Sequence, residues 1–130
     1  MKQEYKELLL KDLCARLPYG LKAVLKQTNC HNSTKHKVSE KDIYSFRTGK
    51  PLEEDYGQHD YYKVIVTDIK PYLFPLSSMN NEQRTSHNFL KHSAHANPIK
   101  LIDWYNKNHF DYRGLIPMGL ANDATNLNIY

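Results

Sequence analysis

Histidines are the residues of this chain whose type and spacing first suggest chemistry. His92 and His95 lie three residues apart in "HNFLKHSAHA", so on a helix they face the same way and can share a metal ion. His87 precedes His95 by eight residues, about 80° round the same helix. A zinc site needs a third and a fourth ligand, and the neighbouring sequence supplies no convincing carboxylate or thiolate. We therefore predict solvated surface histidines here and no metal site.

His109 and Asp111 are a second candidate, because a histidine beside a carboxylate is a common acid–base pair in enzymes. The alternative is structural: His109 favours a helix C-terminus through the helix dipole, and Asp111 caps the short turn that follows. The sequence contains no nucleophile elbow, phosphate loop, dinucleotide fingerprint or zinc-protease motif. We favour capping and predict a protein that is not an enzyme, with no catalytic residue and no cofactor. An acid–base enzyme using this pair is the third candidate function.

Tyrosines and cations offer a binding chemistry, since aromatic rings stack on bases and lysines contact phosphates. The candidate binding residues are Tyr61, Tyr62, Trp104, Tyr105, Tyr112 and Arg113. The candidate basic patch consists of Lys22, Lys26, Lys35 and Lys37. The alternative is that the tyrosines fill seams between sheet and helices with their hydroxyls at the rim, and that the net charge of +4 serves solubility.

A helix over residues 3–17 is the first element that must position these groups. Its apolar side chains recur at three- and four-residue steps, which is typical of a helix with one buried stripe. They are Tyr5, Leu8, Leu9, Leu13 and Leu17. Pro18 and Gly20 end this helix, since proline cannot continue it and glycine accepts turn geometry. Cys14 falls on its apolar side, and we expect it to be a small core residue.

The middle of the chain has the composition of β structure. Strands are predicted over residues 21–27, 42–46 and 61–69. The last strand stops before Pro71, which has no N–H to give to a ladder. Between the strands we predict polar turns at 28–41 and a mobile loop at 52–60. Three or four such strands make a small antiparallel sheet or a partly closed barrel.

The last section is helical and follows an extended connector over residues 70–79. Asn80 and Gln83 have capping-box spacing, which predicts a helix that runs to about residue 94. Asn97 then caps a second helix whose first residue is Pro98. On this helix a charged face opposes an apolar arc, with Trp104 between them. The charged face is Lys100, Asp103 and Lys107, and the apolar arc is Ile99, Leu101, Ile102 and Tyr105.

The predicted fold is therefore α+β in a single domain over residues 1–130, with an N-terminal helix, a small sheet and C-terminal helices. The apolar run near the N-terminus is only "LLL", which is neither a signal-peptide core nor a membrane span. We thus expect a cytoplasmic protein with no membrane partner. Cys14 and Cys30 are then expected to be reduced, and their spacing matches no zinc site.

Two phrases, "IKPYLFPLSSM" and "LIDWYNKNHFDYRGLIPMGLA", resemble a group of short uncharacterised proteins of gut Bacteroidetes and of their phages and mobile elements. Members of this group often open with a stretch like "KDLCARLPYG" at residues 11–20. This chain has Phe74 where the group commonly has arginine, and Asn108 where it commonly has a first histidine. The first change removes a cation that a ligand site would use, and the second leaves a single histidine in the phrase. The resemblance brings no catalytic residue and implies a bacterial host.

The stretch over residues 109–121 combines charged and apolar side chains, and we predict that it fixes the C-terminal part to the core. Its predicted core plugs are Phe110, Leu115, Ile116 and Met118. Asp111 and Arg113 are the predicted ties of the turn. Residues 28–60 look specific to this chain, so we expect specificity there, as in binding loops held by a rigid scaffold.

These patterns lead to one preferred function and to one alternative that ranks before the acid–base enzyme. We expect a small non-enzymatic binding protein of phage or mobile-element type in the bacterial cytoplasm. It would engage a host macromolecule or sequester a small anionic, nucleotide-like ligand. The alternative is a weakly basic protein that associates with nucleic acid, because the pI is near 9.0.

Overall fold

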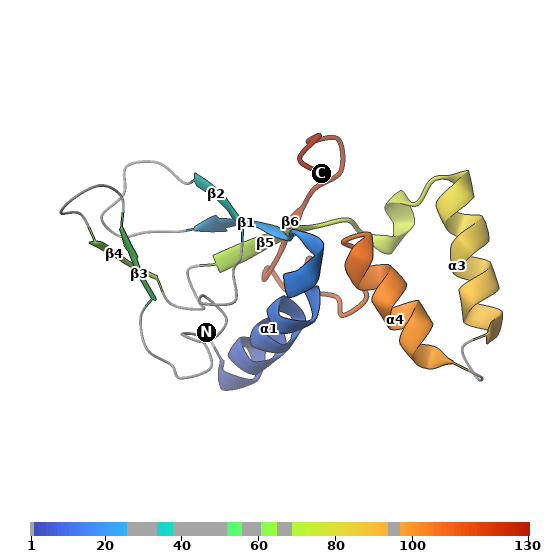
Figure 1. Cartoon of the computed structure of the whole chain (residues 1–130), viewed down its shortest axis with the longest axis horizontal. Helices are drawn as coiled ribbons and strands as arrows, with labels where there is room; N and C mark the ends of the chain where they lie inside the picture. The colour runs from blue at the N-terminus through green and yellow to red at the C-terminus, as the bar shows by residue number, and fades with distance from the viewer. Residues whose placement is uncertain (1, 26–33, 38–51, 56–60, 65–68, 94–96) are drawn as a thin grey trace.

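The described part of the chain is an α+β structure in which helices flank a small sheet (Figure 1). The computed structural model describes residues 2–25, 34–37, 52–55, 61–64, 69–93 and 97–130. The helices of this part are α1 (Gln3–Arg16), η1 (Leu17–Tyr19), η3 (Leu76–Ser78), α3 (Asn81–Ser93) and α4 (Pro98–Lys107). The strands are β1 (Lys22–Leu25), β2 (Thr34–Lys37), β3 (Leu52–Asp55), β4 (Tyr61–Val64), β5 (Ile69–Leu73) and β6 (Asn122–Asp123). The predicted fold class is confirmed.

The main sheet has the strand order β2-β1-β5-β6, and β3 and β4 form a separate antiparallel pair. β1 pairs antiparallel with both β2 and β5, as predicted, whereas β6 runs parallel to β5. The segment that contains β6 follows α4 in the chain and lies beside β5, where Ala124 N–H donates to the carbonyl of Leu73 at 2.8 Å. The sheet is therefore mixed and open, so the expectation of a purely antiparallel sheet is wrong at its last strand.

Two strands lie where the sequence predicts turns or a mobile loop. β2 falls within residues 28–41, and β3 falls within residues 52–60. Their sequences, "TKHK" and "LEED", lack the alternation of apolar and polar residues that predicts a strand. Each forms a strand only because it pairs with a neighbouring strand. The strand predicted over 42–46 lies outside the described residues.

Pro71 lies inside β5 rather than after a strand, opposite Ala23 of β1. β6 pairs only with Tyr72 and Leu73, so no strand in the described part of the chain pairs with the other side of β5 at Pro71. A proline fits at such a position because no ladder bond needs its missing N–H. The prediction that the strand ends before Pro71 is therefore wrong.

The core lies between α1 and the inward face of the sheet. Leu9 and Leu13 of α1 pack with residues of the sheet and of the C-terminal segment, all of them buried. The sheet and C-terminal members are Leu21, Ala23, Ile69, Leu73, Leu115, Leu120 and Ala121. Cys14, by contrast, is exposed, so the prediction that it is a core residue is wrong. It does not share the side of α1 that buries Leu9 and Leu13.

The helix ends are those that the sequence predicts. Asn80 Oδ1 accepts from the N–H of Gln83 at 2.8 Å, and Gln83 Oε1 accepts from the N–H of Asn80 at 2.9 Å. Asn97 Oδ1 accepts from Lys100 N–H at 3.4 Å, with Pro98 first in the helix. Gly20 ends the first helical segment with φ 69°, a conformation that glycine adopts without strain.

α4 does not bury the apolar arc that its sequence predicts. Tyr105 and Asn106 are its buried residues, whereas Ile99 is 68% and Ile102 38% exposed. The reason is that the C-terminal segment and α3 cover only part of this helix. Within the described residues, no helix is long and apolar enough to cross a membrane.

Candidate functional site

A set of charged side chains joins α1 to the segment after α4; we call Asp12, Arg16, Asp111 and Arg113 the polar junction. The first three are buried, and Arg113 is partly buried. Asp12 Oδ2 accepts from Arg16 Nε at 2.8 Å, and Asp12 Oδ1 accepts from Arg113 Nε at 3.2 Å. Arg16 Nη2 also donates to the carbonyl of Phe110 at 2.6 Å. Burial raises the pKa of the Asp12 carboxyl, and the neighbouring Arg16 partly offsets this rise. The buried carboxylate of Asp12 and the buried guanidinium of Arg16 are therefore paired with each other, as a buried ion pair requires, although Arg16 Nη1 has no hydrogen-bond partner.

Asp111 closes the turn of this junction, as the capping interpretation predicts. Its Oδ1 accepts from Leu115 N–H at 2.8 Å, and its Oδ2 accepts from Ile116 N–H at 2.9 Å. Both carboxylate oxygens are thus bonded to backbone N–H groups, and neither is bonded to His109. The arrangement is that of a cap and not that of an acid–base pair.

His109 lies just after α4 with φ 61°, a left-handed conformation. Its ring is buried and stacks on the ring of Tyr130 at a centroid distance of 3.7 Å and an interplanar angle of 13°. Burial, together with the nearby charges of Arg16 and Lys22, lowers the pKa of His109 to about 4. The ring is therefore neutral near pH 7, so the predicted attraction between a charged His109 and the helix dipole is wrong. Its contribution is packing.

Four of the six predicted binding residues lie together beside α4. Tyr105 and Tyr112 stack at 5.1 Å, and the Arg113 guanidinium lies 4.8 Å from the Tyr112 ring centre. Trp104 stacks on Phe110 at 5.3 Å. Of the four, Tyr105 is buried, and Trp104 and Tyr112 are partly buried against the same cluster of Met79, Tyr105 and Phe110. Tyr61 and Tyr62 belong to β4 and are not part of the cluster.

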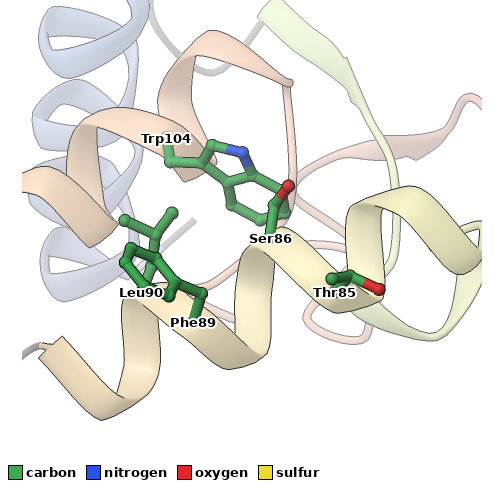
Figure 2. Close-up of a pocket in the computed structure, with 5 residues that line it drawn as sticks. All are labelled: Thr85, Ser86, Phe89, Leu90 and Trp104. Carbon is green, nitrogen blue, oxygen red and sulfur yellow. The ribbon is translucent and has the colours of Figure 1, made fainter.

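An open pocket of about 450 Å³ lies where α3 meets α4. Figure 2 shows the side chains that line it, namely Thr85, Ser86, Phe89, Leu90 and Trp104. Phe89 is 72% exposed beside this pocket, and α3 contributes no buried residue. Of these five residues, the sequence analysis identified only Trp104. The sequence feature that could have identified the other four is the adjacent phenylalanine and leucine on a helix that is otherwise polar.

The histidines of α3 do not form the set that their spacing suggests. His87 stacks on Trp104 at 5.7 Å, and its Nε2 lies 2.6 Å from the hydroxyl of Tyr105. Burial and the nearby Lys91 lower the pKa of His87. His87 is thus partly buried by these contacts, rather than fully solvated as the sequence predicted. His92 is exposed, and His95 lies outside the described residues. Among the residues that the structure describes, no group of three histidine, cysteine or acidic residues is placed to hold a metal ion.

The strand register brings most of the predicted basic patch together. Lys37 lies opposite Lys22, and Lys35 lies opposite Val24. Lys70, which the sequence analysis did not assign to this patch, lies opposite Val24 on the other neighbouring strand. Lys26 lies outside the described residues. Lys70 is identified as part of the patch by its register with β1. This register exists only in the folded sheet.

The described residues thus contain two accessible candidate surfaces, the pocket between α3 and α4 and the lysine-bearing face of the sheet. The polar junction is mostly buried and has the contacts of a structural element. Neither protein-family models, nor curated protein sequences, nor solved structures gave a match to this chain.

Proposed function

We propose that this chain is a small non-enzymatic binding protein of phage or mobile-element type that engages a protein of its bacterial host. The binding site of this proposal is the surface formed by Thr85, Ser86, Phe89, Leu90 and Trp104, here called the helical surface. The observation that carries the proposal is Phe89, whose side chain is 72% exposed beside an apolar pocket. An aromatic side chain beside such a pocket is typical of an interaction site.

The base of the helical surface is held in place before any partner binds. Trp104 lies between the rings of His87 and Phe110, at centroid distances of 5.7 Å and 5.3 Å. The capping box of Asn80 and Gln83 fixes the start of α3. A surface that is already ordered loses little side-chain entropy on binding, which favours affinity.

The charges of the two helices favour an acidic partner. Among the described residues α3 and α4 carry more lysine and arginine than aspartate and glutamate. The cations are Arg84, Lys91, Lys100 and Lys107, and the carboxylates are Glu82 and Asp103. Complementary charge raises the association rate and excludes partners of the wrong sign. We therefore propose an amphipathic partner segment that inserts an apolar side chain into the pocket and carries acidic residues beside it.

A displayed library of random peptides tests this proposal. The full chain, labelled with a fluorophore, is used to sort the library, and the enriched peptides are measured against variants. We expect enriched peptides to be acidic with an aromatic or aliphatic residue, and Phe89→Ser to weaken their binding at least about tenfold, the 1.4 kcal/mol typical of an interface anchor. Leu127→Ser is the matched control, since Leu127 is also apolar and 50% exposed but lies outside α3 and α4.

Two results would overturn the proposal. The first is a set of enriched peptides that bind the Phe89→Ser variant as tightly as the unchanged protein. The second is enrichment of basic or purely polar peptides, which would contradict the charge argument. Loss of binding in the Leu127→Ser control as well would assign the peptides to a different surface.

A further inference from the structure

The sheet has an inward face and an outward face of opposite character. The inward residues Ala23, Ile69 and Leu73 are buried against α1. The register places four lysines at outward positions of the three neighbouring strands β2, β1 and β5. They are Lys22, Lys35, Lys37 and Lys70, and we call this face the lysine face. Because residues directly opposite one another belong to the same face, these positions form one patch.

The described residues of β1, β2 and β5 include no carboxylate. Val24, Tyr72 and Asn122 hold the other outward positions of the main sheet, and Asp123 of β6 is exposed but in register with the inward Leu73. Lys22 and Lys37 are directly opposite one another in the register of β1 and β2.

Lys22 and Lys70 of this face differ in how accessible their side chains are to a ligand. Lys22 is half-buried, and its Nζ donates to the carbonyl of Ile129. Its backbone N–H donates to the hydroxyl of Tyr130 at 2.9 Å, and this hydroxyl donates to the carbonyl of Tyr72 at 2.8 Å. Lys70 is exposed. Lys70 is therefore the described residue of this face best placed to contact a ligand.

We infer that the lysine face binds single-stranded nucleic acid, with its lysines on phosphates. The major groove of a duplex admits a helix or a two-stranded ribbon, whereas this face spans at least three paired strands. Single strands instead lie on sheet faces that combine cations with aromatic rings, and half-buried Tyr72 lies two residues from Lys70 in this row. Figure 1 shows α3 at one end of the molecule and α4 between α3 and the sheet, so this site is separate from the pocket between α3 and α4.

Fluorescence anisotropy with labelled oligothymidylate, and with a duplex of equal length, tests this inference across about 50 to 200 mM salt. We expect binding at low salt, a preference for the single strand, and a steep loss of affinity as salt rises. The variant with Lys35→Gln, Lys37→Gln and Lys70→Gln is expected to reduce the slope of log affinity against log salt by about 2, since each phosphate contact to a single strand contributes about 0.7.

The matched control removes the same charge from the helices through Lys91→Gln, Lys100→Gln and Lys107→Gln. It is expected to leave the slope unchanged, as is Phe89→Ser. Equal loss in this control would mean that net charge alone attracts the oligonucleotide, and would overturn the inference. Tighter binding of the duplex, or no binding at the lowest salt, would overturn it too. Because the Phe89→Ser variant separates the two surfaces, failure here leaves the proposed protein-binding function intact.

Discussion

The polar junction and the helical surface lie on either side of α4, and they differ in what they bury. The junction takes charged groups out of water and gives each of them a partner: Asp12 and Arg16 are fully buried. α3, on the other side, buries no residue and exposes Phe89. Charged side chains thus tie α1 to the segment after α4 beside an apolar core, whereas α3 leaves an apolar side chain exposed.

The junction also ties segments that are far apart in the sequence. Arg16 donates to the carbonyl of Phe110, 94 residues away, and Arg113 donates to Asp12, 101 residues away. The contacts of α3 are instead with α4, the helix that follows it. We therefore expect changes at the junction to affect the whole domain, and changes on α3 to affect binding.

The largest effect is expected from removing residues 109–130. This truncation takes away Phe110, Leu115 and Leu120, which are buried, and truncating a large buried side chain typically costs about 2–5 kcal/mol. The sum exceeds the stability of an ordinary domain of about 5–15 kcal/mol once the polar junction is lost as well. We expect no cooperative thermal transition by circular dichroism. A truncated chain that melts like the full one would show that this segment does not hold the core.

The next largest effect is expected from Arg16→Met. The substitution keeps much of the side-chain volume but leaves the buried Asp12 with Arg113 alone, and breaking such a pair typically costs about 3–5 kcal/mol. Urea denaturation measures the loss as a lower midpoint. The matched control is Arg84→Met on exposed α3, whose expected loss is below about 1 kcal/mol. Equal losses in both variants would contradict the comparison.

A smaller effect is expected from His109 as pH falls. The pKa of His109 is about 4 in the folded protein, against an ordinary value of 6.5, so the unfolded chain takes up the proton first. The stability from the neutral ring is therefore complete above pH 6.5 and is lost as pH falls from 6.5 to about 4. His109→Asn removes this titration, and asparagine tolerates the left-handed backbone at this position. Urea midpoints across this range should fall less in the variant; an identical fall would contradict the assignment.

The smallest effect on stability is expected from Phe89→Ser. The side chain is exposed, and substitutions at such positions usually change stability by within about 0.5 kcal/mol. We expect the thermal midpoint to stay within a few degrees, while peptide binding is lost. A large fall of the midpoint would show that Phe89 supports the fold, and the helical surface would then be a structural seam.

The sequence by itself determined the helices of this protein and their ends. α1, the Asn80–Gln83 capping box and the Asn97–Pro98 helix start are all where the sequence predicts them. It also predicted that Asp111 caps the turn after α4. These features depend on residues three to five positions apart, so the local sequence contains all of their interactions.

Only the tertiary structure decided which strands form, which lysines share a face and which apolar residues stay exposed. β2, β3 and the position of Pro71 within β5 depend on pairing with other segments, and local pattern does not encode that pairing. Lys70 joins the lysine face through its register with β1. Phe89 is exposed because no other element covers that side of α3 in the described structure. The sequence around it does not distinguish it from a buried phenylalanine. Burial and register depend on contacts between distant residues, and those contacts exist only in the folded chain.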